Sequence, residues 1–270
     1  MATLASKERP RVADGESMRW RLGKWLFLPF RLLFKLWFLV TFFLGLLVLY
    51  IPFRVLLHKP SGYRKAFHLK RLWARVQQFL SLIPAKVERR GALPEAPYVI
   101  CCNHGSYLDI VHMYNVIPEY FLFMGKQELK RWPLIGMFFK GMNIAVNRSN
   151  HVEAVRAIRR AGLEIDKGVS VAIFPEGTIP PFAPRMKAFK DGAFKLAIEK
   201  QVPIVPVTFL DHWKLLGEPS NIFSRARPGI ARAIVHPYVD TKGMTEADLV
   251  DLRQQVFKII EEPLLEYART

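Results

Sequence analysis

Two short polar clusters hold residues that could do chemistry. The first, NHGSYLD at 103–109, directly follows the apolar stretch PYVICC at 97–102. Neutral imidazole takes up a proton near neutral pH, so His104 is a candidate general base for an alcohol that attacks a thioester. Asp109, at the start of the next helix, could accept the other imidazole N–H and stabilise the imidazolium. Taken alone, a surface histidine beside a helix-capping aspartate is the alternative.

The second cluster is FPEGT at 174–178, and it also ends an apolar stretch. Proline and glycine force a tight turn there, which exposes backbone N–H groups and places Glu176 at the mouth of the strand. An ionised glutamate cannot hold a phosphate itself, so it would orient a lysine or arginine or accept a substrate hydroxyl. A surface turn with Thr178 as a cap is the alternative. N–H groups near Gly177 or at the start of helix 107–116 are candidate donors to a tetrahedral oxyanion.

NHGSYLD and FPEGT, followed by FKDGAF at 189–194 and VPIVPV at 202–207, resemble the motifs of the 1-acylglycerol-3-phosphate O-acyltransferase family over residues 85–210. The resemblance implies an enzyme that moves an acyl chain from acyl-CoA or acyl carrier protein to the sn-2 hydroxyl of lysophosphatidic acid, giving phosphatidic acid. It implies His104 and Asp109 as the catalytic pair, with no cofactor beyond the thioester co-substrate. It also implies substrate contacts from Glu176, Gly177 and Thr178.

The family's phosphate-binding motif, a glycine followed six residues later by arginine, is partly kept. Met142 stands at the glycine position, and asparagine replaces the common aspartate before Arg148. Arg148 is the leading phosphate ligand because its planar fork matches phosphate oxygens, and Lys126 is the second candidate. The arginine often found after FPEGT is absent, so Arg185 or Lys187 is the expected substitute.

Positioning these clusters requires an α/β domain with a mostly parallel sheet flanked by helices, in which ligands bind at the carboxyl ends of strands. Apolar stretches predict strands at 97–102, 119–124, 142–146, 170–174, 203–209 and 230–236. Helices are predicted at 107–116, 133–140, 151–166, 187–200 and 245–266. An amphipathic helix is also predicted from about Tyr63 to Pro84.

The N-terminal quarter differs in composition: residues 1–75 hold 15 basic and three acidic residues of a chain with net charge +17. The uncharged run 36–53 is about long enough to cross a bilayer, and basic residues beside it favour anionic lipids over nucleic acid. Positive charges flank both ends, so a spanning, re-entrant or monotopic helix all remain open, as does a buried soluble helix. Trp20, Trp25 and Trp37 suit the headgroup region, and Arg31 and Lys35 could reach lipid phosphates from one helical face.

These features predict a flexible tail at 1–18, membrane-anchoring helices at 19–84 and an acyltransferase domain at 85–270. Neither a signal peptide nor a disulfide framework is indicated, since the two cysteines, Cys101 and Cys102, are neighbours. We expect a membrane protein whose catalytic domain faces the cytoplasm. Metal-ligand spacings and nucleotide-binding loops are not found, so no metal is expected.

Four other interpretations stay open. Ser106 could act as a nucleophile with His104, although no G-x-S-x-G elbow occurs; Cys101 and Cys102 are poorer nucleophile candidates because they lie in an apolar strand. The acceptor could be another lysolipid, such as a lyso-ornithine lipid. The chain could also be a non-catalytic lipid-binding protein, whereas nucleic-acid binding is suggested only by the pI of about 10.1.

Overall fold

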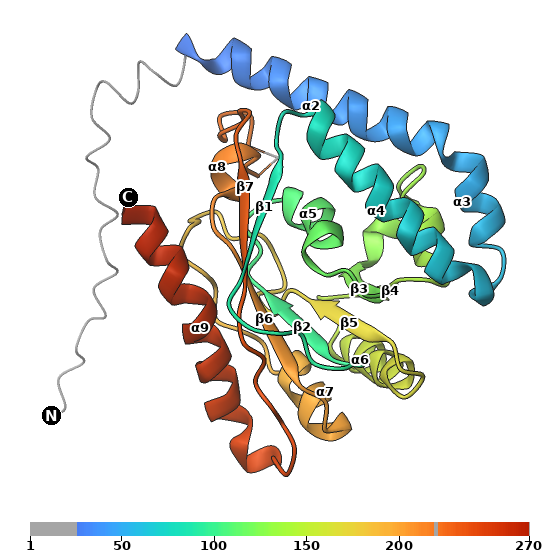
Figure 1. The fold of residues 1–270 in the computed structure, drawn as a ribbon, viewed down its shortest axis with the longest axis vertical. Coiled ribbons are helices and arrows are strands. Elements are labelled where there is room, and N and C mark those ends of the chain that lie inside the picture. Colours follow the sequence, from blue (N-terminus) through green and yellow to red (C-terminus); the bar gives the residue numbers. More distant parts are fainter. Residues whose placement is uncertain (1–25, 219–220, 270) are drawn as a thin grey trace, which may run out of the picture.

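A computed structural model describes residues 26–218 and 221–269 as a sheet covered by helices on both faces, with a pair of long helices along one side (Figure 1). The predicted α/β class is therefore confirmed. The predicted tail at 1–18 and the tryptophans Trp20 and Trp25 lie outside the described residues.

The sheet has seven strands in the described part of the chain, in the order β1-β7-β6-β2-β5-β3-β4. Their bounds are β1 Ala85–Arg89, β2 Val99–Cys102, β3 Phe121–Lys126, β4 Ile144–Val146, β5 Ser170–Ile173, β6 Ile204–Phe209 and β7 Ala231–Val235. Neighbouring strands are parallel except β6 and β7, which are antiparallel. The central strands β2, β5 and β6 are buried along their whole length, as expected where helices cover both faces.

All six predicted strands are present, and the structure adds β1. Its sequence, AKVER, is polar and mostly exposed, because β1 is an edge strand that pairs only with β7 among the described strands. The apolar criterion used for the other strands could not detect it.

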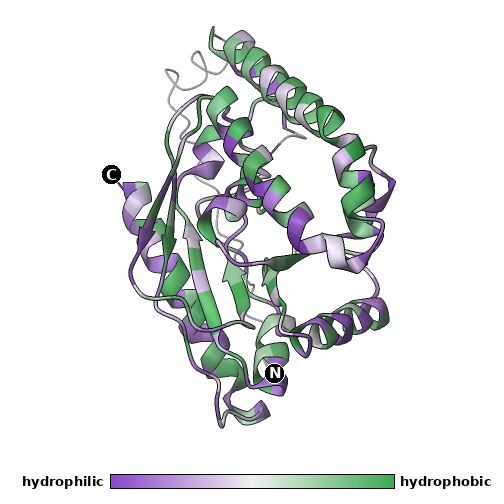
Figure 2. Cartoon of the chain, turned by 45° about the vertical axis from the view of Figure 1, so that its right-hand side comes forward, coloured by the Kyte–Doolittle hydropathy of each residue, from purple (hydrophilic) through white to green (hydrophobic). Residues whose placement is uncertain are grey.

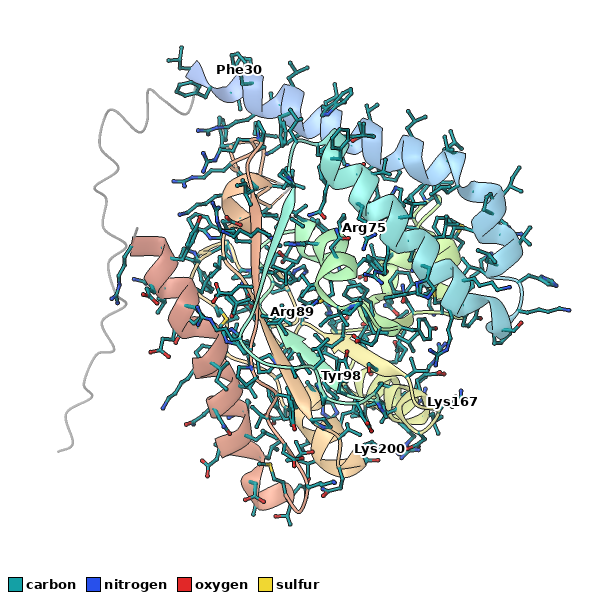
Figure 3. All side chains as sticks on the ribbon, viewed as in Figure 1. Phe30, Arg75, Arg89, Tyr98, Lys167 and Lys200 are labelled. Atoms are coloured by element: carbon teal, nitrogen blue, oxygen red, sulfur yellow. The ribbon has the colours of Figure 1, made fainter. Side chains whose placement is uncertain are left out.

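Helices α5 Leu108–Val116, α6 His151–Ile165, α7 Gly192–Lys200 and α9 Leu249–Arg269 flank the sheet. Helix α7 packs against both α6 and α9 on one face, and α5 lies on the other face beneath α4. Lys200 at the end of α7, labelled in Figure 3, forms an ion pair with Asp166 beyond α6 (Nζ–Oδ2 2.7 Å).

Two helix predictions need correction, and one further helix is present. Residues 133–140 contain a short 3₁₀ helix, η3 Gly136–Phe139, in place of an α-helix. Helix α7 begins at Gly192 instead of 187, because the backbone N–H groups of Lys187 and Lys190 bond to the turn around Glu176. A four-residue helix, α8 His212–Leu215, was not predicted.

Before the sheet, the chain forms α2 Leu28–Val48, α3 Tyr50–Leu56 and α4 Tyr63–Leu80. Helix α2 is long and apolar enough to cross a membrane, with a mean hydropathy of 2.0 and only 17% of its apolar window buried. Its inner face packs on α4, where Phe42 and Trp73 meet edge-to-face at 4.8 Å and Gly45 leaves room for the indole of Trp73. Its outer face is exposed and apolar (Figure 2).

Arg31 and Lys35 lie on one face of α2, as their spacing predicts, but they contact protein instead of reaching toward lipid phosphates. Lys35 Nζ donates to the carbonyl oxygens of Asn221 and Ile222 and to Ser224 Oγ, at 2.9–3.2 Å. Arg31 donates to the carbonyl of Phe223 at 3.4 Å. These contacts attach the beginning of α2 to the loop between α8 and β7.

Lys70 of α4 provides a stability prediction. The side chain is buried, with its Nζ 3.2 Å from the Tyr114 hydroxyl and 3.9 Å from the ring centre of Phe138. Burial lowers the pKa of Lys70 from 10.5 to about 7, so the unfolded chain binds this proton more tightly and stability should rise with pH across that interval. Lys70→Met removes the buried cation, and below pH 7 we expect it to raise the free energy of unfolding by about 1–4 kcal/mol.

The check is thermal unfolding in detergent at several pH values, where the Tm of Lys70→Met should vary less with pH than that of the wild type. Lys65→Met, which changes an exposed lysine of the same helix, is the matched control. A lower Tm for Lys70→Met than for Lys65→Met would contradict this account.

Candidate active site

Polar side chains collect at the carboxyl edge of the parallel strands. Each of five strands ends in one or two of them: Asn103 after β2, Lys126 at the end of β3, Arg148 after β4, Glu176 after β5, and Asp211 and His212 after β6. Because β2, β5 and β6 are adjacent and parallel, their polar ends meet at one place.

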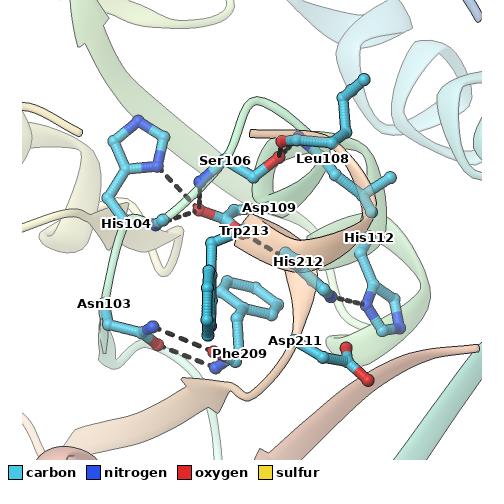
Figure 4. A network of polar contacts seen from close by, with 12 residues as sticks. Asn103, His104, Ser106, Leu108, Asp109, His112, Phe209, Asp211, His212 and Trp213 are labelled. Carbon is cyan, nitrogen blue, oxygen red and sulfur yellow. Dashed lines mark hydrogen bonds and ion pairs between the residues drawn. The ribbon is translucent and has the colours of Figure 1, made fainter. Parts of the chain in front are cut away.

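His104 and Asp109 form a buried pair at the centre of this edge (Figure 4). His104 Nδ1 lies 2.8 Å from Asp109 Oδ2, and the two backbone N–H groups of Gly105 and Ser106 donate to the same oxygen at 2.8 and 2.9 Å. The turn between β2 and α5 therefore wraps around the carboxylate and fixes it. This arrangement leaves Nε2 of His104 as the ring nitrogen that can take a proton from a substrate.

The carboxylate of Asp109 is fully buried and nevertheless stays ionised. Burial alone would raise its pKa, but hydrogen bonds from the imidazoles of His104 and His212 outweigh that effect and lower it. A buried negative charge beside His104 is what an imidazolium formed during proton transfer requires.

Glu176 joins the two motif turns to each other. Its Oε1 accepts the backbone N–H of His104 and its Oε2 accepts the backbone N–H of Lys187, both at 2.8 Å. Burial raises the pKa of Glu176 to about 7 despite these two bonds. Phe174, two residues before Glu176, stacks on the imidazole of His104 with ring centres 4.0 Å apart.

The turn after Glu176 is lined by cations. Gly177 has a φ of +74°, a conformation that favours glycine, and its carbonyl accepts a hydrogen bond from the Arg148 guanidinium. The Lys190 side chain lies so close to Gly177 that a Cβ there would be 3.2 Å from its Cε. Burial lowers the pKa of Arg148, although arginine remains charged. Thr178 follows in an exposed position.

Lys126 lies on the same side of the sheet but is more exposed. Its partner in the β3–β4 ladder is Val146, two residues before Arg148. Its ammonium group is 3.4 Å from the carboxylate of Glu128. The negative charge of Glu128 also favours the charged form of the Arg148 guanidinium. The structure thus gathers the predicted substrate-binding residues near one edge of the sheet, with Lys126 at its periphery.

A small cavity opens directly beside His104. Its lining includes Gly105, Glu176, Arg185 and Trp213. Arg185 is therefore the better placed of the two predicted substitutes for the arginine missing after FPEGT, since Lys187 takes part through its backbone.

The proposed nucleophile Ser106 is engaged elsewhere. Its hydroxyl donates to the carbonyl of Leu216 and accepts the N–H of Leu108, and the residue is fully buried. Cys101 and Cys102 are also fully buried, and burial raises the pKa of both thiols. None of the three side chains presents a nucleophile beside His104.

Two of the backbone N–H groups in the regions predicted to supply oxyanion donors already have partners. The N–H of Gly177 donates to the carbonyl of Phe174 at 3.0 Å, and the N–H of Leu108 donates to Ser106 Oγ at 2.9 Å. Both groups are occupied within their own turns.

His212 and Trp213 are the residues of the site that sequence reasoning missed. His212 Nδ1 lies 2.6 Å from Asp109 Oδ1, and Trp213 lines the cavity beside Gly105. A signal was present, because the sequence DHW follows the strand 203–209, and polar residues at the carboxyl end of a parallel strand mark a site. Within residues 26–218 and 221–269, no group of three or more His, Cys, Asp or Glu residues is arranged to hold a metal ion.

Comparisons with known proteins agree with this geometry. Residues 84–210 match the family model described as Acyltransferase. The 1-acyl-sn-glycerol-3-phosphate acyltransferase alpha of Mus musculus is 31% identical over 229 residues, covering 83% of this chain and 77% of that protein. Its Homo sapiens counterpart is 33% identical over 177 residues, covering 63% and 61%. The chain spans about half the length of some other relatives, 56% of one from Caenorhabditis elegans and 54% of one from Arabidopsis thaliana.

Among solved structures, the 1-acyl-sn-glycerophosphate acyltransferase PlsC from Thermotoga maritima has the same fold, with a TM-score of 0.69 over 89% of this chain and 97% of that one, at 22% identity. Sequence relatives, family model and fold agree with the motifs and with the buried imidazole–carboxylate pair. The chain therefore belongs to the 1-acylglycerol-3-phosphate O-acyltransferase family.

Proposed function

We propose that this chain transfers an acyl group from a thioester, acyl-CoA or acyl carrier protein, to the sn-2 hydroxyl of 1-acyl-sn-glycerol 3-phosphate, forming phosphatidic acid. The observation that carries the proposal is the His104–Asp109 pair, whose 2.8 Å contact leaves Nε2 free beside a cavity at the carboxyl edge of the sheet. The names of the sequence relatives support the choice of acceptor.

In this reaction Nε2 of His104 accepts the hydroxyl proton as the alcohol oxygen attacks the thioester carbonyl carbon. The tetrahedral intermediate collapses, the carbon–sulfur bond breaks, and the imidazolium returns the proton to the leaving thiolate. The Asp109 carboxylate accepts the hydrogen bond from the Nδ1–H of His104 throughout and stabilises the imidazolium. Transfer is direct, without an acyl-enzyme, in keeping with the engaged hydroxyl of Ser106.

The acceptor phosphate lies, in this proposal, at the cations around Gly177, with Arg148 as its main ligand. Arg148→Met removes charge-assisted bonds to phosphate, so we expect the KM for lysophosphatidic acid to rise about 10- to 100-fold with a smaller change for the thioester. Arg148→Lys should recover part of this, since lysine keeps the charge but loses the fork. Steady-state kinetics with each substrate varied in turn provides the measurement.

Arg156→Met, which removes an exposed arginine of α6, is the matched control for that series. If Arg148→Met lowered kcat/KM equally for lysophosphatidic acid and for monoacylglycerol, which lacks the phosphate, Arg148 would act only by holding the Gly177 turn.

Association with membranes is indicated by the exposed apolar face of α2, and we propose that α2 lies along one leaflet instead of crossing the bilayer. Lys35 ties its beginning to the loop between α8 and β7, and Trp37 donates to the carbonyl of Leu80 at 2.8 Å. Beyond its end, Phe53 of α3 packs on Phe138 with ring centres 4.9 Å apart. Both ends are thus held by the catalytic domain.

We further propose that the bound surface is anionic and that the catalytic domain faces the cytoplasm, where soluble acyl thioesters are found. Exposed basic residues around α3 and the start of α4 support the first point: Arg54, Lys59, Arg64 and Lys65.

The function is tested with the purified full chain on vesicles that contain lysophosphatidic acid or another lysolipid, each combined with acyl-CoA or acyl carrier protein thioesters. Lipid mass spectrometry should detect phosphatidic acid as the main product. No transfer to any acceptor would favour a non-catalytic lipid-binding protein, and preference for a phosphate-free acceptor such as a lyso-ornithine lipid would overturn the proposed substrate.

A further inference from the structure

Two buried histidines continue the hydrogen-bonded chain behind the catalytic carboxylate (Figure 4). Asp109 Oδ1 is 2.6 Å from Nδ1 of His212, and Nε2 of His212 is 2.8 Å from Nδ1 of His112. His104, Asp109, His212 and His112 therefore form one chain of contacts. His212 comes from α8 and His112 from α5, so the chain links two elements that are far apart in the sequence.

Neither additional histidine can contact a substrate. The exposed fractions of His212 and His112 are 1% and 0%, and neither lines the cavity beside His104. The ring of Phe209 packs on both, with ring centres 4.6 Å from His212 and 5.9 Å from His112. Any effect they have on the reaction must pass through Asp109.

The positions of the protons follow from the role of His104. A free Nε2 on His104 requires its proton on Nδ1, donated to Asp109 Oδ2. Oδ1 then accepts the Nδ1 proton of His212, and Nε2 of neutral His212 accepts the Nδ1 proton of His112. The last nitrogen, His112 Nε2, is buried without a hydrogen-bond partner among the described residues, as suits an uncharged ring with no proton there. Burial, and then the nearby His212, lower the pKa of His112 well below its usual range.

We propose that His212, supported by His112, is a positioning residue for acyl transfer: as a neutral donor it fixes the second oxygen of Asp109 and leaves the carboxylate charge to His104. The inference rests on the proposed function. A cationic His212 would instead neutralise Asp109 and leave the imidazolium of His104 without its counter-charge. A neutral donor fixes the carboxylate without this loss.

The surrounding charged groups are directed elsewhere. Asp211, which precedes His212 in the sequence, is paired with the Arg232 guanidinium at 2.8 Å and accepts a hydrogen bond from the Tyr267 hydroxyl at 3.2 Å. The Lys214 ammonium lies over the ring of Tyr267. On the sheet side the Cys102 thiol is neutral, because burial and then Asp109 raise its pKa well above the usual range.

Two substitutions separate positioning from packing. His212→Phe keeps a ring but removes the donor, and we expect kcat to fall about 10- to 100-fold while KM for both substrates stays within about 2-fold. His212→Asn places a permanently neutral N–H near the position of Nδ1, so kcat should recover to within a few-fold of the wild type. His236→Phe, which removes another buried histidine bonded to Thr208, is the matched control.

A second readout does not need catalysis. Nuclear magnetic resonance of the full chain with isotope-labelled histidine should show His212 and His112 as neutral Nδ1–H tautomers at neutral pH. The resonance of the hydrogen-bonded Nδ1 proton of His104 should lose intensity or change its chemical shift in His212→Phe but not in His236→Phe. This measurement tests the role of His212 even if the wild type transfers no acyl group. The absence of transfer would contradict the proposed function without contradicting the inference about His212.

Either of two results would overturn the inference. One is a His212→Phe enzyme as active as His236→Phe, with an unchanged His104 proton signal. The other is a His212 that carries protons on both nitrogens at neutral pH. Should His212→Phe not fold, His112→Phe gives the same comparison with His212 in place and a smaller expected loss of about 3- to 10-fold in kcat.

Discussion

Without its imidazole, His104→Ala should transfer acyl groups about 10³- to 10⁴-fold more slowly than the wild type, with the fold intact. The loss is in kcat, because the alcohol must then release its proton to water during attack. The turn survives because its contacts use other groups: Glu176 binds the backbone N–H of residue 104, and Asp109 binds the N–H groups of Gly105 and Ser106. Phosphatidic acid formation on vesicles, followed by mass spectrometry, measures the change.

His151→Ala is the matched control, since it removes an exposed histidine from the first turn of α6. Circular dichroism of both variants establishes that the fold is kept. Transfer by a folded His104→Ala enzyme at the normal rate would rule out general-base catalysis by this residue. A covalent acyl adduct on Ser106 would rule out direct transfer.

The buried part of the fold was predictable because parallel strands covered on both faces are continuously apolar. Strands such as VICC of β2 and IVPVTF of β6 stand out for this reason. Strand β1 could not be found in the same way, because an edge strand has one ladder partner and its residues face water. The late start of α7 was equally hidden, since it depends on Glu176 accepting the backbone N–H of residue 187, 11 residues further along the connection between β5 and α7.

The His104–Asp109 pair was predictable because its members are five residues apart and lie in one turn. Local spacing alone places His104 within reach of Asp109. His212 is 103 residues from Asp109 along the chain, and its contact exists because β6 lies beside β2. The order of the residues in the sequence does not show that β6 lies beside β2, so the contact between His212 and Asp109 could not be predicted before the strand order was known.

The N-terminal helices show a similar limit. Spacing placed Arg31 and Lys35 on one helical face correctly, but what that face meets depends on the loop at 221–224. Charge beside an apolar helix suggested lipid phosphate, whereas the structure supplies backbone carbonyls as acceptors for both side chains.

Asp109→Asn is expected to lower kcat about 10²- to 10⁴-fold through loss of charge, with little change in the turn. The asparagine oxygen should take the place of Oδ2, where three donors converge: His104 Nδ1 and the N–H groups of Gly105 and Ser106. Its NH₂ group then faces His212, whose ring can accept at Nδ1 when both His212 and His112 change to their Nε2–H tautomers. His104 keeps its Nδ1 proton, so its free Nε2 survives while the imidazolium loses its counter-charge.

The KM values distinguish this loss of charge from a disordered site. An ordered site that lacks only the carboxylate charge should lose kcat while the KM for both substrates stays within about 2-fold of the wild type. Asp240→Asn, which changes an exposed carboxylate beyond β7, should leave both kcat and KM unchanged. A fall in kcat accompanied by a large rise in both KM values would mean that Asp109 supports the turn without acting on the imidazole, and the electrostatic role assigned to it would be wrong.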